Sequence, residues 1–447
     1  MASIAAANLR TRIEEISSAI SHHRELIRDL EKQKSAVQGD LNTILDPMAR
    51  LPFEISSDIL LRCLPTSHQP DPDHAPMVFL DICRSWRNIV LATPELWADV
   101  RVDSPFSAGY EKFLHRWLAR AATRPLSLSL HGVFTQRTED LIDQYVHQTQ
   151  TLQLYFPSAD GLADILAPQR IFSSLRVLTI GQGDPFECED SEDEESEAEN
   201  NSSSEYYSHD PGECVEILAA SPNVVRFTLD RIHFHVKGST PASQRLTHSN
   251  LTDLSIGGSL GPSSTFILPY LTLPALQRLS ILECVIAFKD FLAFLARSSS
   301  PLHSLSMKLP FRIRRDTPAD RFLELIPLIT DLDLDLLHGS KDLSDFGSSV
   351  ILAIGSYNQL VPNLRHLTIR GSPEQLLPQY RQLLSAVYTR RAVPHSQLQA
   401  FRFFWNDYFS IAGVREINLD ADIVIAMHEL IADGMEIHIG TEERNLV

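Results

Sequence analysis

A recurring apolar unit constrains the fold of this chain more than any other feature. The unit reads L-x-x-L-x-L/I, and its clear copies begin at Leu175, Leu251, Leu276, Leu302, Ile329 and Leu364. With weaker copies included, the central residues are Leu126, Leu152, Leu178, Phe227, Leu254, Leu279, Leu305, Leu332, Leu367 and Phe401. Most neighbouring centres are 25 to 27 residues apart. A strand and helix of that length cannot bury their apolar sides alone, so the pattern predicts a solenoid of stacked α/β units over residues 101–447.

Helices are expected between these strands, where apolar residues recur at helical spacing. They are predicted at Tyr110–Ala122, Phe288–Arg297, Asp320–Ile326, Asp342–Ile354 and Pro373–Tyr388. The last unit is predicted as a helix capped by Gly434, followed by a final strand over Met435–Ile439 that covers the open edge of the array. The residues after that strand are expected to fray.

One spacing, from Leu178 to Phe227, is 49 residues, and an acidic insertion explains it. Glu187–Glu205 holds ten acidic and no basic residues, in a chain whose formal net charge is -18. This composition predicts a disordered insertion at about 185–210. Ser191 and Ser196 are each followed by Glu three residues later, so regulated phosphorylation is one interpretation and a solubilising loop is the other.

The first 47 residues predict a long helix with a coiled-coil-like seam. From Leu9 to Ile44 the seam positions alternate in steps of four and three residues, and only His23 and Lys34 among them are polar. Pro47 is expected to end the helix. Two interpretations stay open: self-association through residues 9–45, and docking of the helix on its own domain.

Residues 48–100 predict a small helical domain. Pro52 stands at a helix start, and Ile55, Ile59 and Leu60 then share one helical face. A Pro-rich connector over Pro65–Pro76 separates this helix from a second apolar stripe. That stripe is predicted to contain Val78, Ile82, Trp86 and Ile89 or Val90. A unit of about 50 residues buries little surface, so its apolar residues are expected to complete their core on a partner.

The order of residues in this domain resembles the F-box, in the form abundant in fungi. The matching residues are Leu51-Pro52-x-Glu54-Ile55, Ile59, Leu64, Ile82-Cys83-Arg84-x-Trp86-Arg87-x-Ile89 and Pro94-x-Leu96-Trp97. The resemblance implies docking on the Skp adaptor of a cullin-RING ubiquitin ligase. The adaptor-binding residues that it implies are Leu51, Pro52, Ile55, Ile59, Leu60, Ile82, Trp86 and Trp97. The connector is longer than in the shortest F-boxes, and the alternative is that these residues pack against the next domain.

The recurring units resemble leucine-rich repeats. The Asn or Cys that usually follows the strand is mostly missing, and Cys284 after Ile281 is the one good match. The resemblance implies an irregular leucine-rich-repeat-like array. The expected fold is therefore α+β in several parts: a long helix over residues 1–47, an F-box-like helical unit over 48–100, and an α/β solenoid over 101–447.

Candidate catalytic and metal-binding patterns favour a protein that is not an enzyme. Ser259 lies in a G-x-S-x-G match, but Pro262 follows where a nucleophile elbow requires a helix. Asp331, Asp333 and Asp335 resemble a calcium loop, yet the sequence D-L-D-L-D alternates as a strand with one buried face does. The five cysteines lack metal-ligand spacing. No catalytic residue, cofactor or metal is predicted.

Charge and hydropathy narrow the classes of partner. An acidic chain without a Lys/Arg stripe does not suit a nucleic acid, because binding to phosphates depends on releasing their counterions. No apolar run approaches the roughly 18 residues of a membrane span. The first ten residues do not have the form of a secretion signal, so the cytoplasm or the nucleus is the expected compartment.

A protein ligand is the expected partner of the array, because strand periodicity turns mixed charges and a few aromatic residues to its exposed concave face. The candidate target-binding residues are Tyr155, Arg226, Asp230, Asp253, Arg278, Lys308, Asp331, Asp333, Asp335, His366, Arg370, Arg402 and Phe404. The alternative is a solvated sheet face without a ligand.

The expected function is a non-catalytic substrate receptor, which binds the adaptor, and through it the cullin, with its F-box and an unknown target protein with its repeats. Two other functions are considered. One is a scaffold that dimerises through the N-terminal helix and has no ligase role, and the other is an esterase that uses Ser259.

Overall fold

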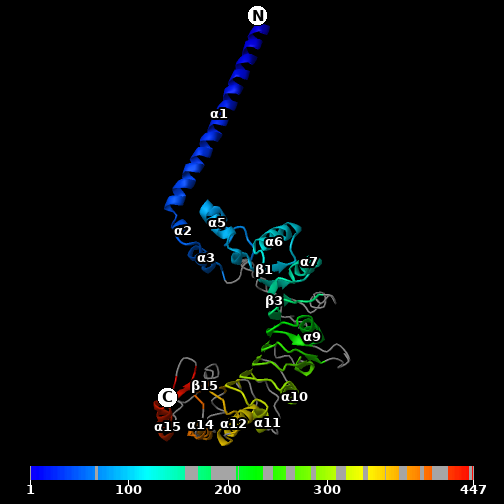
Figure 1. The fold of residues 1–447 in the computed structure, drawn as a ribbon, viewed down its shortest axis with the longest axis vertical. Helices are drawn as coiled ribbons and strands as arrows, with labels where there is room; N and C mark the ends of the chain where they lie inside the picture. Colours follow the sequence, from blue (N-terminus) through cyan, green and yellow to red (C-terminus); the bar gives the residue numbers. More distant parts are fainter. Residues whose placement is uncertain are drawn as a thin grey trace, which may run out of the picture. The chain divides into compact units, whose positions relative to one another are not determined.

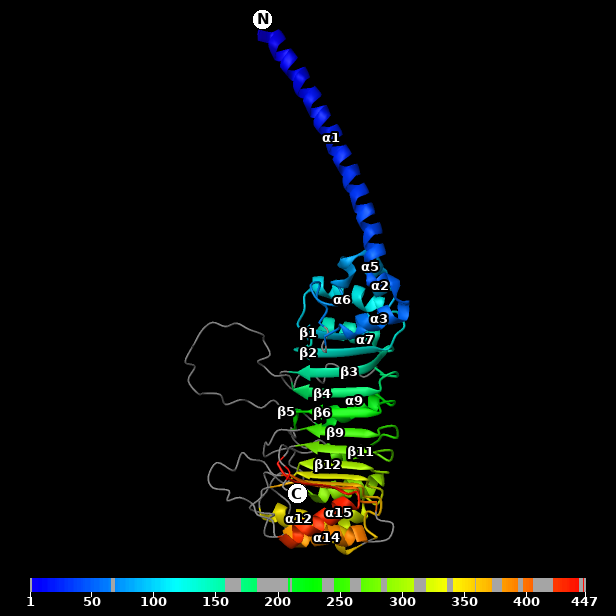
Figure 2. The same cartoon turned by 90° about the vertical axis from the view of Figure 1, so that its left-hand side faces the viewer.

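The structure of the 447-residue chain is a computed structural model (Figures 1 and 2). It describes residues 2–65, 69–156, 170–182, 208–209, 211–234, 245–257, 267–282, 288–308, 319–335, 341–357, 359–371, 380–392, 397–404, 421–441 and 445. Most of the acidic insertion, Ser259 and Cys284 lie outside these residues. The chain divides into two compact units. Unit 1 is Met1–Arg101 with Ser107–Leu126, and unit 2 is Val102–Phe106 with Ser127–Val447.

Unit 1 is helical. Its helices are α1 (Ala2–Leu45), α2 (Pro47–Arg50), α3 (Phe53–Arg62), α4 (Phe79–Ile82), α5 (Arg84–Leu91), the 3-10 helix η1 (Pro94–Trp97) and α6 (Ala108–Arg120). The predicted long helix is confirmed, and Pro47 begins the next helix after α1 ends. The predicted single stripe from Val78 to Val90 is wrong, because the extended backbone of Cys83 (φ -160°, ψ 173°) separates α4 from α5.

Two tryptophans centre the core of unit 1. The rings of Trp97 and Trp117 meet edge to face with centroids 5.0 Å apart, and the guanidinium of Arg120 lies 4.4 Å from the centroid of the Trp97 ring. Burial lowers the pKa of Arg120 from its ordinary value. Leu60 and Val90 are fully buried in the same unit. The helices therefore close a small core around large aromatic side chains.

Unit 2 is mixed α/β and contains a large parallel sheet (Figure 2). The strands of the twelve-stranded sheet are β1 (Asp99–Ser104), β2 (Leu126–Gly132), β3 (Thr149–Phe156), β4 (Val177–Gln182), β6 (Arg226–Asp230), β9 (Asp253–Gly257), β11 (Arg278–Leu282), β12 (Ser304–Lys308), β13 (Asp331–Asp335), β14 (His366–Arg370), β15 (Ala400–Phe404) and β16 (Glu436–Gly440). They lie side by side in chain order, and neighbours from β3 to β16 are parallel. Two short sheets pair β5 (Ser208–His209) with β7 (His233–Phe234), and β8 (Leu246–Thr247) with β10 (Leu271–Thr272).

The register of the sheet follows the recurring sequence unit. From β3 to β15, each predicted central residue is the cross-strand partner of the next. These residues are Leu152, Leu178, Phe227, Leu254, Leu279, Leu305, Leu332, Leu367 and Phe401, and all are buried. A slip of one residue would turn every apolar side chain of a strand to the opposite face, so burial specifies this register.

Helices accompany the strands of unit 2, and α9, α10 and α11 lie on one side of them (Figure 1). The helices are α7 (Gln136–Tyr145), α9 (Pro211–Ala220), α10 (Phe288–Ser298), α11 (Ala319–Glu324), α12 (Lys341–Ser356), α14 (Tyr380–Ala392) and α15 (Ala421–Ala432), with the 3-10 helix η2 (Leu268–Tyr270). Phe288 of α10 packs on Phe322 of α11 and Phe346 of α12, with ring centroids 5.9 and 5.1 Å away. Consecutive helices thus share an aromatic core. The predicted helices over residues 288–354 are confirmed.

The end of the large sheet is formed by β16, which Asn445 pairs through its side chain. Gly434 has the positive φ (84°) of a helix C-cap after α15, as predicted, and β16 follows it. The side-chain amide of Asn445 then makes the hydrogen bonds to β16 that a neighbouring strand would make. Its Oδ1 accepts a hydrogen bond from Ile439 N (2.9 Å), and its Nδ2 donates one to Ile437 O (3.1 Å). The expectation that the tail simply frays is wrong at Asn445, which pairs the edge strand.

The contact between α12 and α14 generates a stability prediction. A Cβ on Gly355 would lie 2.4 Å from the Cβ and 2.6 Å from the Cα of Ala386, so the two helices would have to move apart. We expect Gly355→Ala to lower the free energy of unfolding by about 1–3 kcal/mol, although alanine favours helices. Thermal unfolding followed by circular dichroism measures the change.

Gly39→Ala is the matched control, because a Cβ on this helical glycine of α1 would meet nothing within 4 Å. It should leave the melting temperature unchanged or raise it. Equal melting temperatures for Gly355→Ala and the wild type would contradict the close approach of α12 and α14.

Candidate protein-interaction surfaces

Seven large apolar side chains are exposed on the short helices of unit 1 or at their caps. They are Leu51, Phe53, Ile55, Ile59, Val78, Ile82 and Leu91, between 37% and 51% exposed. We call this set the apolar surface of the short helices. Exposed apolar side chains that gather in one small unit are typical of a protein-binding site.

Asp46 and Ser56 hold the helices that carry this surface. Asp46 Oδ1 accepts hydrogen bonds from Met48 N (2.9 Å) and from Trp86 Nε1 (3.2 Å), so one oxygen caps α2 and binds the indole of α5. The buried hydroxyl of Ser56 in α3 donates to Met48 O (3.0 Å). On the other side of Cys83, Arg87 Nε donates to Leu80 O (2.8 Å) and joins α5 to α4. These hydrogen bonds therefore hold the short helices in position relative to one another, which the small apolar core alone would do only weakly.

The predicted adaptor-binding residues divide between this surface and the core. Leu51, Pro52, Ile55, Ile59 and Ile82 are exposed. Trp86 is half-buried and hydrogen-bonded to Asp46.

Leu60 and Trp97, in contrast, are 0% exposed, so they support the unit from within and do not contribute to its surface. The sequence interpretation missed Phe53, and it named Val78 on the second apolar stripe without including it among the adaptor-binding residues. Both residues are apolar and stand near the predicted apolar faces, and this is the sequence feature that could have placed them on the surface.

The second surface is the side of the large sheet opposite its buried Leu and Ile residues. We name its rows by their offset from the central buried residue of each strand. Row one, one residue before it, contains Arg226, Asp253, Arg278, Ser304, Asp331, His366 and Glu436. Row two, one residue after it, contains Thr179, Thr228, Ser255, Ser280, Ser306, Asp333, Thr368, Arg402 and His438. Row three, three residues after it, contains Tyr155, Asp230, Leu282, Lys308, Asp335, Arg370 and Phe404. The thirteen candidate target-binding residues thus share one face of the sheet.

Many charges on this face are paired with one another. Arg278 bonds to Asp253 on the neighbouring strand. Arg370 Nη1 lies 2.5 and 2.6 Å from the two carboxylate oxygens of Asp333. Cross-strand pairs of opposite charge stabilise a sheet modestly, and half-exposed ion pairs contribute about 0–1 kcal/mol each. Charged groups of a partner can therefore compete with these ion pairs at a small cost in free energy.

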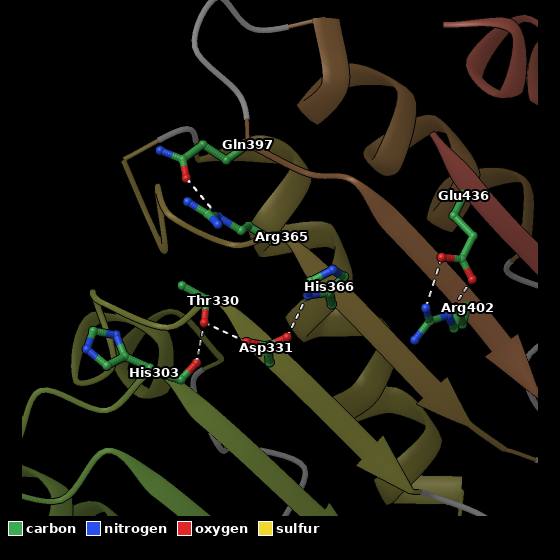
Figure 3. A network of polar contacts seen from close by, with 8 residues as sticks. All are labelled: His303, Thr330, Asp331, Arg365, His366, Gln397, Arg402 and Glu436. Atoms are coloured by element: carbon green, nitrogen blue, oxygen red, sulfur yellow. Dashed lines mark hydrogen bonds and ion pairs between the residues drawn. The ribbon is translucent and has the colours of Figure 1, made fainter. Parts of the chain in front are cut away.

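A polar network occupies the C-terminal part of the face (Figure 3). His366 Nδ1 lies 2.5 Å from Asp331 Oδ1, and Thr330 Oγ1 donates to the other oxygen of Asp331 at 2.6 Å. Arg402 donates to both oxygens of Glu436 at 2.9 Å, from Nε and Nη2. The hydrogen bonds to Arg402 lower the pKa of Glu436, and those to Glu436 raise the pKa of Arg402. Sequence reasoning missed Glu436 because it extended the strip only as far as Phe404.

Aromatic residues stand near both ends of the face. Tyr155 stacks on His131 with ring centroids 4.6 Å apart, and its ring covers Gly181, where a Cβ would lie 2.7 Å from it. At the other end, Phe404 lies 4.7 Å from the ring of His438. Between these ends, row two presents the short hydroxyl side chains of Thr228, Ser255, Ser280 and Ser306, so a partner can approach the backbone closely. Aromatic residues are enriched in protein–protein interfaces.

The described residues carry no group of three or more His, Cys, Asp or Glu arranged to hold a metal ion. Asp331, Asp333 and Asp335 alternate along β13 with buried Leu332 and Leu334, as expected of a strand. The candidate nucleophile Ser259 lies outside the described part of the chain. None of the described helices combines the length and apolar character that crossing a bilayer requires.

Comparisons with protein-family models and with curated proteins gave no match. The two surfaces themselves are therefore what indicates a function for this chain.

The two hydrogen bonds of Asp46 should stabilise the helices that carry the apolar surface. Asp46→Ala removes the cap of α2 and the acceptor of the Trp86 indole, so we expect the free energy of unfolding to fall by about 1–2 kcal/mol. Asp46→Asn keeps the Oδ1 acceptor of both bonds and should retain most of that stability. Chemical unfolding followed by tryptophan fluorescence compares the variants. Equal losses for Asn and Ala would show that the shared oxygen is not what matters.

The ion pair of Glu436 with Arg402 should make the stability of the folded protein depend on pH. The pKa of Glu436 in the folded state is lowered, so the stabilisation from the Arg402 pair is complete above the ordinary carboxyl pKa and is lost as the pH falls through the folded value. We expect Glu436→Gln to cost less than about 1 kcal/mol at neutral pH, because both side chains are partly exposed. The difference from wild type should shrink towards about pH 3. Melting temperatures across this range measure it, with exposed Glu429→Gln as a control that should match wild type throughout.

Proposed function

We propose that this protein is a non-catalytic substrate receptor of a cullin-RING ubiquitin ligase. The observation that carries the proposal is the exposure of Leu51, Ile55, Ile59 and Ile82 on short helices. These residues stand in the order that resembles an F-box, and exposed apolar groups on a helical unit with a small core suit docking on a partner such as the Skp adaptor.

In this proposal the sheet face recognises the target protein. The parallel strands and their regular register support a leucine-rich-repeat-like solenoid whose rows of polar residues form the recognition surface. Because Arg370 and Asp333 are both partly exposed, the charges of a target can compete with this ion pair at a modest cost in free energy. The pattern of signs along the rows would then contribute specificity.

The proposed mechanism is proximity. A receptor that binds the adaptor with one unit and a target with the other raises the effective concentration of the target's lysines near a ubiquitin-charged enzyme. The chemistry occurs on other subunits, so the receptor itself needs no catalytic residue. The cytoplasm and the nucleus are the compartments that suit this function.

A scaffold without a ligase role is the second candidate. It is favoured by one observation: the apolar seam of α1 is exposed along the helix, as in a chain that gathers copies or partners. Adaptor binding distinguishes the two functions, because a scaffold has no reason to bind the adaptor.

The test is purification of the full chain with the Skp adaptor, with affinity measured by calorimetry. We expect a complex of one chain with one adaptor. Leu51→Ala combined with Ile55→Ala should weaken it at least tenfold, since truncating two central apolar contacts removes more than about 1.4 kcal/mol of binding free energy.

The matched control combines Val133→Ala with Ile171→Ala, two exposed apolar residues of unit 2 that are 54% and 61% exposed. It should bind the adaptor as wild type does. Circular dichroism verifies that each variant is folded. A folded wild-type chain that does not bind the adaptor would refute the receptor function, and the scaffold function would then be preferred.

A further inference from the structure

The seam of α1 is exposed at each of its described apolar positions. Those positions are Leu9, Ile13, Ile16, Ile20, Ile27, Leu30, Val37 and Leu41, between 45% and 67% exposed. Of the two interpretations left open by the sequence, docking on the chain's own domain would have buried these residues.

A helix of this kind needs a partner. With 44 residues and a rise of 1.5 Å per residue, α1 extends over about 66 Å. Helices in proteins obtain most of their stability from packing an apolar face, and an isolated helix in water obtains none of it. Apolar residues in regular steps of four and three have an average period of 3.5 residues. Two helices with this period keep their apolar seams in contact by supercoiling around each other, so the seam predicts another helix with the same repeat as the partner.

We propose that α1 pairs with α1 of a second copy of this chain in a parallel, in-register, two-stranded coiled coil. In the heptad frame, the a positions are Ile13, Ile20, Ile27, Lys34 and Leu41, and the d positions are Leu9, Ile16, His23, Leu30, Val37 and Ile44. Branched residues at a with leucine at d favour two parallel strands, and this pattern holds at Leu9 with Ile13 and at Ile27 with Leu30. Ile at both positions, as at Ile13 and Ile16, favours more strands, so the number of strands is decided by the polar residue at Lys34.

The two polar seam residues fit this arrangement. Lys34 occupies an a position and His23 a d position, and each meets its own counterpart in a parallel, in-register pair. A single polar residue at an a position reduces stability but excludes other registers and higher oligomers.

The residues flanking the seam also permit a second copy. In a parallel pair, each g position faces the e position five residues later on the partner helix. The facing pairs are Arg12 with Ser17, Ala19 with Arg24, Leu26 with Glu31, Gln33 with Gln38, and Asp40 with Leu45. Like charges do not meet in any of these five pairs, so the like-charge contact within the seam is the one between the two Lys34 side chains.

The dimer does not depend on the proposed function. Its consequence is that each assembly presents two sheet faces, so a target with two sites would be held by both at once and dissociate more slowly.

The oligomeric state of the full chain tests the proposal, by light scattering after size exclusion and by sedimentation. We expect the wild-type chain to be a dimer. Ile20→Asp combined with Ile27→Asp should be a monomer, because two charged layers replace the centre of the seam. The matched control, Ser18→Asp combined with Ser21→Asp, adds the same charge to the outer face and should remain a dimer. A wild-type chain that is a monomer up to about 100 μM, or a dimer that survives the two seam substitutions, would overturn the proposal.

Charge exchange at Lys34 tests the orientation. When differently tagged wild-type and Lys34→Glu chains are mixed, a parallel, in-register pair places Lys against Glu, so mixed dimers should exceed the statistical fraction. Lys32→Glu makes the same charge change on the outer face and should give the statistical fraction. Native mass spectrometry measures the ratios. A statistical fraction for Lys34→Glu as well would reject the parallel, in-register arrangement.

Discussion

Burial of two apolar side chains per strand is the interaction on which the large sheet depends. In β13, for example, Leu332 and Leu334 are at most 1% exposed, while the three aspartates beside them face the other side. Burying a leucine stabilises a protein by about 1.5–3 kcal/mol, whereas a partly exposed ion pair adds about 0–1 kcal/mol. The apolar pair therefore decides the register, and the ion pairs between neighbouring strands follow from it. The polar face is thus free to vary in sequence without changing the fold.

The dominance of apolar burial over ion pairing also explains which features could be predicted from the sequence. An apolar residue at every second position and a spacing near 26 residues are enough to locate the strands and to align Leu254, Leu279 and Leu305. The register then placed the candidate residues of the strip on one face. Their ion pairs, such as Arg402 with Glu436, follow from which strands become neighbours, and the strip as predicted ended before β16.

Unit 1 was harder to predict because short helices depend on contacts made far along the chain. The break at Cys83 is stabilised by contacts such as the bond from Trp86 to Asp46, forty residues away in sequence. The F-box resemblance implies that Leu60 and Trp97 bind the adaptor, yet they lie in the core, where Trp97 packs on Trp117 and Arg120. A pattern of apolar spacing identifies a face but does not say whether that face meets the same chain or another one.

The order of the strands has a consequence for how the protein is made. Each strand of the sheet pairs with the one synthesised just before it, so the sheet can grow as the chain leaves the ribosome. Until synthesis passes β16, every nascent chain presents an unpaired strand edge to its surroundings. Asn445, which pairs the edge of β16, is synthesised after every strand of the large sheet. Slow or interrupted translation would prolong the interval in which that open edge can recruit a chaperone or another nascent chain.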